Sequence, residues 1–479
     1  MKNFIFDNSY RKLSASFYSD VLPEIPINPK LLVWNQKLAD QLEIGLTLEH
    51  EEQICALFSG SEIPEGCKPL SMAYAGHQFG NFTMLGDGRA VLLGERITSK
   101  KNRFDVQLKG SGRTPFSRGG DGLATTRAML KEYLISECMY ALGIPTSRSL
   151  SVVQTGKNVL RETPNPGAIL TRIMDSHLRV GTFEYARHFL STEEQKELLK
   201  YAIWRHFPSL SDCENPALLF LKNVADKQRE LIIQWMRVGF IHGVMNTDNM
   251  HIGGQTFDYG PCAFMNAYNP KTVFSSIDRN GRYAYANQAE IALWNLSVLA
   301  GALLPQIDEN EDIAVELAKN VLNEFASQYR NDWSALMCKK IGFHTPSLQA
   351  KLLVERLLSW MQLNQADYTN TFLVLSEDVP IDSIPVNDGF KIWLSDWKEL
   401  LAKETNFKDA HDTMKQINPK VIPRNDKVEA ALDAASNQSD FTLLQELIEV
   451  MTDHNHPKVK KHQFFDANFD RSFQTFCGT

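Results

Sequence analysis

The sequence lacks the features of membrane and secreted proteins. None of its apolar runs approaches the roughly 20 residues that a helix needs to span a bilayer. The N-terminus, MKNFIFDNSYRKL, has only a short apolar patch that Asp7 and Asn8 interrupt, so it lacks the apolar core of a signal peptide. We therefore expect a cytoplasmic protein without a membrane partner.

Cysteine and histidine motifs are also missing. The chain has seven cysteines with no CxxC pair, it has no HExxH motif, and His242 and His251 have no partners at ligand spacing. These absences argue against zinc sites and thioredoxin-like motifs, and buried reduced thiols are the expected state of six cysteines. Cys477, third from the end, is a possible redox residue because a terminal thiol is exposed, although a frayed tail is the alternative.

An excess of basic charge is absent as well. Fifty Lys and Arg residues stand against 57 Asp and Glu residues, which gives a net charge of -7. This balance gives no reason to expect a nucleic-acid partner. The 43% hydrophobic and 22% charged residues are typical of a soluble globular protein.

The secondary-structure pattern changes along the chain. Residues 1–70 look irregular, with one short helix expected at 31–42. Mixed α and β structure follows: strands at 90–96 and 105–110, a helix at 123–142, a strand at 149–154, a Thr-Gly-Lys-Asn turn, and two more strands in VLRE and AILTRI. From about residue 191 the chain is mostly helical, with helices at 227–240 and 288–303, and its basic tail HNHPKVKKHQFF is expected to be irregular.

The segment FIHGVMNTDNMHIGGQTFDYG holds the strongest group of candidate site residues. Asp248 and Asn249 adjoin, and Asp258 follows in an Asp-Tyr-Gly turn. Carboxylate and carboxamide oxygens suit Mg²⁺ and leave room for phosphates and water, while a second carboxylate can accept a proton from an attacking hydroxyl. Asx-turn chemistry in the loop 246–249 is the structural alternative.

Lysine, glutamate and arginine candidates lie upstream. Lys109 ends the apolar run DVQLKG, where it could contact phosphate, and Glu132 could orient that lysine. Arg172 and Arg179 could hold a pyrophosphate, because guanidinium groups bind phosphate oxygens bidentately. A solvated lysine, a solvated helix charge and structural salt bridges are the respective alternatives.

Two glycine-rich segments could bring backbone close to a polyanion. LGDGR contains Gly86, Gly88 and Arg89, and GSGRTPFSRGGDG contains Asp121 and Gly122. A hairpin turn and a flexible surface loop are the alternatives.

This inventory suits kinase-type phosphoryl transfer, but its spacing differs from that of ordinary kinases. In those enzymes the base follows His-Arg or His-Gly, whereas here Val244 follows His242 and Gly243. The pattern predicts a kinase-like fold in which the usual base is displaced.

The chain closely resembles the selenoprotein O family from about residue 20 onward. The resemblance rests on several motifs in one order: GHQFG (76–80), LGDGR (85–89), LKGSGRTPFSRGGDG (108–122), HGVMNTDNM (242–250), DYGP (258–261), GRYAYANQ (281–288) and WNL (294–296). Members of this family are protein nucleotidyltransferases with a pseudokinase fold. They bind ATP inverted relative to kinases, transfer AMP to Ser, Thr or Tyr hydroxyls and release pyrophosphate.

The resemblance also implies roles for individual residues. Asp248 matches the proposed base, Asn249 and Asp258 match the metal ligands, and Glu132 matches the glutamate that orients the lysine. The nucleotide-binding positions are Gly86, Gly88, Arg89, Lys109, Asp121, Gly122, Arg172, Arg179 and Asp258.

Two positions depart from the family pattern. Some members pair an internal cysteine with the near-terminal one, and that internal position is Phe274 here, so redox control through Cys477 is in question. Ala289 replaces a proline that often follows Asn-Gln, with little expected consequence.

We therefore expect an α+β, kinase-like, two-lobed fold with N- and C-terminal extensions. The expected parts are an extension at 1–70, a nucleotide-binding small lobe at 71–190, a helical large lobe at 191–400 and a C-terminal extension at 401–479. The expected function is Mg²⁺- or Mn²⁺-dependent AMP transfer from ATP to protein hydroxyls by a monomer. UMP transfer from UTP, ordinary protein phosphorylation and a non-catalytic nucleotide-binding scaffold are the alternatives.

Overall fold

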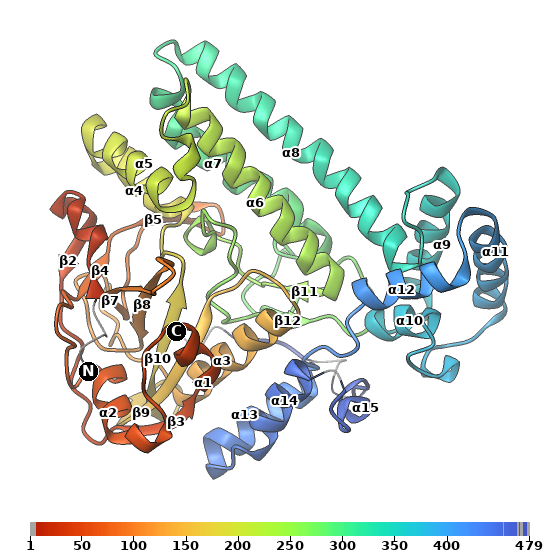
Figure 1. Ribbon diagram of the computed structural model, residues 1–479, viewed down its shortest axis with the longest axis horizontal. Coiled ribbons are helices and arrows are strands. Elements are labelled where there is room, and N and C mark those ends of the chain that lie inside the picture. Colours follow the sequence, from red (N-terminus) through yellow and green to blue (C-terminus); the bar gives the residue numbers. More distant parts are fainter. Residues whose placement is uncertain (1–5, 454, 467–468, 470–472, 477–479) are drawn as a thin grey trace.

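A computed structural model of the 479-residue chain describes residues 6–453, 455–466, 469 and 473–476 (Figure 1). It is a mixed α and β structure, which confirms the predicted α+β class. Cys477 lies outside the described residues.

An eight-stranded sheet forms one side of the molecule, with strand order β2-β4-β7-β8-β10-β9-β3 and β1 paired to β7. The strands are β1 (Phe6–Asp7), β2 (Tyr18–Asp20), β3 (Lys30–Trp34), β4 (Leu70–Met72), β7 (Ala90–Ile97), β8 (Arg103–Lys109), β9 (Arg148–Leu160) and β10 (Pro164–Met174). Each of these pairings is antiparallel.

The two faces of the sheet pack against different helices. Val106 and Leu108 face a small core with helices α1 (Gln36–Gln41) and α2 (Glu51–Phe58). Side chains alternate along a strand, so Gln107 and Lys109 point to the opposite face. On that face helix α3 (Thr126–Ala141) packs against β9 and β10. The alternation therefore places Lys109 on the side of the sheet that α3 covers.

Three sequence-based expectations for the sheet region are wrong. Residues 31–34 belong to strand β3, which pairs with β9, and the helix begins only after Asn35, whose side chain accepts from Leu38 N. The expected turn at 155–158 lies inside β9, which continues through Gly156 with φ 74° to Leu160. Residues 6–70, the described part of the expected irregular segment 1–70, are also not irregular, because they supply β1, β2 and β3.

The other half of the molecule is helical. Its main helices are α4 (Val180–Phe189), α5 (Thr192–His206), α6 (Pro216–Val238), α7 (Gln288–Ile307) and α8 (Glu311–Lys340). The predicted helices at 227–240 and 288–303 correspond to the second half of α6 and most of α7. Helix α6 starts earlier than predicted because Asn215 caps it and Pro216 takes the first position, and Gly239 ends it with φ 72°.

Helix α7 lies in the middle of this helical half. Among the described residues, one stretch, Tyr285–Ile307, is long and apolar enough to cross a membrane, and half of its most apolar window is buried. Because α7 packs against α4, α6 and α8, a core helix of the fold explains this composition.

The remaining helices follow α8 in the chain. They are α9 (Leu348–Asn364), α10 (Tyr368–Leu375), α11 (Asp388–Glu404), α12 (Phe407–Ile417), α13 (Asn425–Gln438), α14 (Thr442–Thr452) and α15 (Val459–His462). Figure 1 shows α9 and α11 far from the sheet, whereas α13 and α14 return to pack on α3. The short helix α15 corrects the prediction of an irregular tail.

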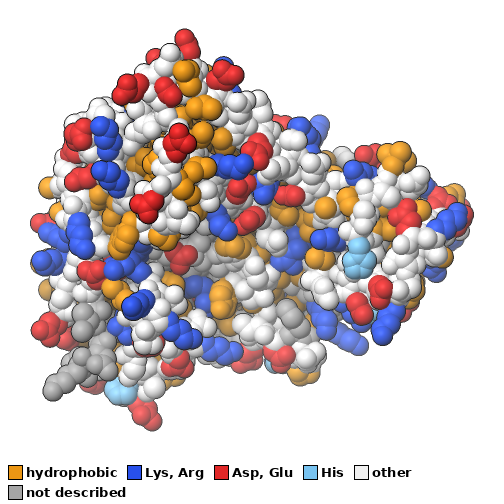
Figure 2. Space-filling view, turned by 45° about the horizontal axis from the view of Figure 1, so that its top comes forward, with side chains coloured by type: hydrophobic (Ala, Val, Ile, Leu, Met, Phe, Trp, Pro, Cys, Tyr) orange, Lys and Arg blue, Asp and Glu red, His pale blue; other side chains and the backbone are white. Residues whose placement is uncertain are grey.

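On the face shown in Figure 2, acidic and basic side chains are interspersed.

Candidate active site

A cavity of about 1100 Å³ lies between the sheet, α3 and the loops that follow α6. Every described residue that the sequence singled out for the site lines it: Gly86, Gly88, Arg89, Lys109, Asp121, Gly122, Glu132, Arg172, Arg179, Asp248, Asn249 and Asp258. The fold thus brings together residues more than 170 positions apart in the chain.

Four charged side chains form an ion-pair cluster at the base of the cavity. Lys109 Nζ donates to Glu132 Oε2 at 2.6 Å and to Asp258 Oδ1 at 2.5 Å. Arg172 Nη2 lies 2.8 Å from Glu132 Oε1 and 2.7 Å from Asp258 Oδ1. Strand pairing explains the meeting of the two cations, because Arg172 of β10 lies opposite Gln107, which shares a face with Lys109.

Asp258 has an unusual backbone and an unusual pKa. Its φ of 61° is left-handed, which few residues other than glycine adopt readily. Burial alone would raise the pKa of Asp258, but Arg172 and Lys109 outweigh it and hold the pKa well below its usual range. Asp258 is therefore a carboxylate at neutral pH.

The loop containing Asp248 and Asn249 is held from several sides. Strand β11 (Phe240–Ile241) leads into it and pairs with β12 (Ala263–Phe264), and a 3-10 turn, Thr247–Asn249, holds the two candidate residues. Asn295 of α7 donates to the carbonyl of Met245 at 3.0 Å. The loop is thus fixed by the strand pair and by α7.

Asp248 is buried, and its Oδ1 has no hydrogen-bond partner among the described residues. Burial raises the pKa of Asp248 to about 6; Arg179 opposes this rise, and Asp258 and Glu184 add to it. An unpartnered buried oxygen is costly to a fold and calls for a ligand. Asp248 therefore has the free oxygen and the pKa that a general base needs.

Asn249 and Asp258 fit a divalent cation. Asn249 Nδ2 donates to the carbonyl of Val244 at 3.1 Å, which leaves its amide oxygen for a metal. Asp258 binds its two cationic partners through Oδ1, which leaves Oδ2. Within the described residues, no group of three or more His, Cys, Asp or Glu could hold a metal. Two protein oxygens completed by phosphates and water are the arrangement that Mg²⁺ favours at phosphoryl-transfer sites.

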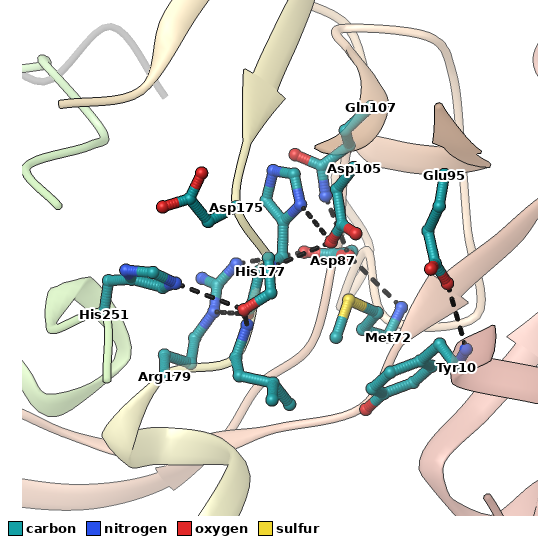
Figure 3. Close-up of polar contacts among 12 residues, drawn as sticks. Tyr10, Met72, Asp87, Glu95, Asp105, Gln107, Asp175, His177, Arg179 and His251 are labelled. Atoms are coloured by element: carbon teal, nitrogen blue, oxygen red, sulfur yellow. Dashed lines mark hydrogen bonds and ion pairs between the residues drawn. The ribbon is translucent and has the colours of Figure 1, made fainter. Parts of the chain in front are cut away.

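Several neighbours hold Arg179 in place, of which Figure 3 shows Asp87 and His177. Its Nη1 donates to the carbonyl of Asp248 at 3.0 Å, and its Nε donates to the carbonyl of His177 at 3.3 Å. Its guanidinium also lies 4.1 Å from the ring centre of Tyr74 and 4.9 Å from that of Phe257. Arg179 therefore offers a cation to the cavity in a preset orientation.

Asp87 is a site residue that the sequence analysis missed. Its Oδ1 lies 3.6 Å from Arg179 Nη2, and its Oδ2 accepts from Gln107 Nε2 and from Met72 N, both at 3.2 Å (Figure 3). Burial raises the pKa of this carboxyl group, and the positive charge of Arg179 partly opposes the rise. The only sequence signal was a carboxylate between Gly86 and Gly88, which we interpreted as part of a glycine turn.

The glycine-rich segments pack tightly beside the cavity. A Cβ at Gly86 would lie 2.3 Å from Cγ of Phe116, and one at Gly122 would lie 2.1 Å from the carbonyl oxygen of Gly112. Both glycines also have positive φ. These positions therefore require glycine.

The polar neighbours of these glycines differ in availability. Asp121 is engaged, because Arg161 Nη1 donates to its Oδ2 at 2.7 Å. Arg89 Nη1 is buried and has no hydrogen-bond partner among the residues that the structure describes, so it is available to bind an anion.

Phe274 stands at the position where the resemblance to the selenoprotein O family implies an internal cysteine in some members. It is buried, and its ring centre lies 5.8 Å from that of Phe473 near the end of the chain. Phenylalanine carries no thiol, so the pair with Cys477 that the family resemblance implies for some members cannot form at this position.

Comparisons with known proteins identify the family of this chain. The family model described as "Protein adenylyltransferase SelO" matches residues 1–452. A protein named protein nucleotidyltransferase YdiU from Brevibacillus brevis is 50% identical over 478 residues, covering 99% of this chain and 97% of the relative. Relatives of the same name from Geobacillus kaustophilus and Pelagibacter ubique are 49% and 46% identical, and each alignment covers 99% of both chains. The chain therefore belongs to the family of the protein adenylyltransferase SelO and is a nucleotidyltransferase.

Proposed function

We propose that the protein transfers AMP from ATP to Ser, Thr or Tyr hydroxyl groups of proteins and releases pyrophosphate. The observation that most supports this is Asp248: a buried carboxyl group with a free oxygen, next to a cation-binding pair and a cluster of phosphate-binding cations. A nucleotidyl transfer needs these three components together.

In the proposed reaction the acceptor hydroxyl attacks the α-phosphorus of ATP. Its proton passes to Asp248, a new oxygen–phosphorus bond forms, and the bond from the α-phosphorus to the bridging oxygen of pyrophosphate breaks. Lys109, Arg172 and Arg179 stabilise the charge that develops on pyrophosphate. A divalent cation held by Asn249 and Asp258 would supply further charge neutralisation and orient the phosphates.

An inverted nucleotide fits these positions. Because Arg172 and Arg179 are both 2% exposed, the β- and γ-phosphates of an inverted nucleotide would lie deep in the cavity, with the α-phosphate nearer its opening. Gly86, Gly88, Arg89, Asp121 and Gly122 would contact the nucleotide along the same cavity.

We infer a kinase-like arrangement of two lobes. The small lobe, residues 71–190, would comprise most of the sheet and α3, and the large lobe, residues 191–400, would comprise α5 to α10 and most of α11. Residues 1–70 and 401–479 would be extensions added to these lobes. We also propose a cytoplasmic monomer that uses Mg²⁺ or Mn²⁺.

Isotope labelling tests the proposed function. The protein is incubated with an acceptor protein mixture and ATP labelled at either the α- or the γ-phosphate, in MgCl₂ or MnCl₂. Retained α-label supports AMP transfer, γ-label supports a kinase, and no label supports a scaffold. Labelled UTP in parallel tests UMP transfer. Asp258→Ala should abolish labelling, and full activity of that variant would refute its role in binding the metal.

A further inference from the structure

The GHQFG segment has no part in the chemistry proposed above, yet it lies against the loop that holds the base. It forms strand β5 (Ala75–Gln78) and the start of a hairpin with β6 (Asn81–Met84). Strand β5 packs between α4 and the 3-10 turn Thr247–Asn249. The hairpin is separate from the main sheet, so its position depends on these contacts.

The backbone of this segment is hydrogen-bonded to the two residues that precede the base in the chain. His77 N donates to Thr247 Oγ1 at 2.7 Å, and Phe79 N donates to Asn246 Oδ1 at 3.1 Å. A Cβ at Gly76 would lie 2.8 Å from Asp248 Oδ1, so the chain here touches the base itself.

The side chain of His77 ties this segment to α4. Its Nδ1 lies 2.5 Å from Oε1 of Glu184, whose side chain is 1% exposed. The imidazole edge also packs on Trp294 of α7, at 5.1 Å between ring centres. A buried carboxylate bonded to a half-buried histidine fixes both elements at one point.

We propose that His77 and Glu184 are positioning residues for the transfer reaction: their pairing holds β5 and α4 together and thereby sets the position of Thr247, Asp248 and Asn249. The reaction part of this inference rests on the proposed function. Neither side chain is among those that line the cavity, so neither is assigned contact with nucleotide or acceptor.

This role predicts a separation of kinetic effects. Lys109, Arg172 and Arg179 do not contact the pair, so the KM for ATP should stay within about twofold. The base should lose its alignment, and kcat should fall by roughly 10- to 100-fold, the range expected for a misplacement of about 1 Å.

The test uses the full-length chain and five variants, one of which is a control. His77→Ala and Glu184→Ala should each show the fall in kcat, and the double variant should be no worse than the more affected single one. Glu184→Gln keeps an oxygen that can accept from His77 and should recover most of the activity. Arg187→Gln, at an exposed arginine one turn along α4, is the control and should behave like the wild type.

Rates are measured with whichever phosphate label the wild type transfers. A wild type that transfers γ-label would refute AMP transfer but still test the pair. Wild-type kcat in both alanine variants, or an equal fall of all variants including Arg187→Gln, would overturn the positioning role. A large rise in the KM for ATP at unchanged kcat would overturn it too.

A second measurement does not depend on activity. Asn249 N donates to the carbonyl of Asn246 at 2.9 Å, so hydrogen–deuterium exchange at this amide reports the order of the loop. We expect faster exchange in a peptide covering 244–250 in both alanine variants, with unchanged exchange in α6. Unchanged exchange in the 244–250 peptide would refute the proposal, whatever activity the wild-type protein shows.

Discussion

At the scale of single residues, the pKa of Asp248 predicts how activity depends on pH. A general base works as the carboxylate, so the transfer rate should rise with pH through the pKa and level off above it. Burial raises this pKa to about 6, and a cation bound beside Asn249 would lower it. We expect the acid limb of kcat/KM to have its midpoint at pH 6 or below. A midpoint well above pH 6, with an acceptor that does not titrate there, would argue against Asp248 as the base.

The two aspartates should also differ in what they do for stability. Asp248→Asn removes a buried charge that lacks a partner for Oδ1, so the free energy of unfolding should be unchanged or higher, while kcat falls by about 10²- to 10⁴-fold. Asp258→Asn leaves Lys109 and Arg172 without a shared carboxylate and should lower the free energy of unfolding by roughly 3 kcal/mol, the low end for breaking a buried ion pair. Urea unfolding of both variants measures the contrast. Equal stability of the two variants would contradict this account.

Residue type in the sequence was enough to single out residues that the fold brings into one cavity, but it did not single out Asp87. Asp248, Asn249 and Asp258 lie in one short segment, so their chemistry is visible together. Asp87 is recognisable as a site residue only from its ion pair with Arg179, 92 positions away, and from the burial that strand pairing produces. A carboxylate in a glycine turn and a buried partner of an arginine look the same until the chain is folded.

At the scale of single elements, the close approach of β5 to the base can be tested with a methyl group. Gly76 does not have a positive φ, so alanine is compatible with its backbone. The added Cβ would meet Asp248 Oδ1 at 2.8 Å and Thr247 Oγ1 at 3.1 Å, so the base must move. We expect Gly76→Ala to lower kcat by roughly 10- to 100-fold with little change in ATP affinity.

Gly301→Ala is the matched control for that variant. Gly301 lies within α7, and a Cβ there would meet nothing within 4 Å. Alanine in a helix interior is favourable, so this variant should keep full activity and gain slightly in stability. Full activity of Gly76→Ala would mean that β5 does not constrain Asp248.

The elements that the sequence predicted well are those whose pattern is local. Strands β7 and β8 and helix α3 have clear periodicity and punctuation, and the structure confirms them within a few residues. Strand β3 was mistaken for helix because its strand state comes from pairing with β9, more than 110 residues away. The Thr-Gly-Lys-Asn segment resembles a turn, yet Gly156 uses its positive φ inside a continuous strand that is paired on β10. A contact distant in sequence decided the first case, and pairing with the next strand along the chain decided the second.

At the scale of the whole molecule, the C-terminal helices are joined to the site rather than appended to it. Asn425 at the start of α13 accepts from Phe264 N through Oδ1 and donates to the carbonyl of Phe264 through Nδ2. Phe264 belongs to β12, whose partner β11 leads into the loop of Asp248. Arg127 of α3 pairs with Asp433 of α13 at 2.5 Å on the rim of the cavity. The extension therefore supports both sides of the cavity.

Arg424, just before α13, is the residue on which this connection most depends. Its guanidinium is fully buried and makes two hydrogen bonds to Asp367, at 2.7 and 3.0 Å. It also donates to Asn266 Oδ1 at 2.9 Å and to the carbonyl of Gln463 at 2.8 Å. One side chain thus joins the segment after β12, the start of α10 and the C-terminal tail.

Arg424→Ala should lower the free energy of unfolding by about 3–5 kcal/mol, because it leaves the carboxylate of Asp367 buried without its cation. Arg424→Lys should recover only part of this loss, since an ammonium cannot form the paired contact. Arg356→Ala is the control, because its ion pair with Asp396 is about half exposed and should contribute less than about 1 kcal/mol. Urea unfolding of the three variants tests the order. Unfolding of Arg424→Ala and Arg356→Ala at the same urea concentration would contradict this account. Loss of the buried Arg424–Asp367 pair would then cost no more than loss of a surface ion pair, so the buried pair would not be what holds the C-terminal helices against the site.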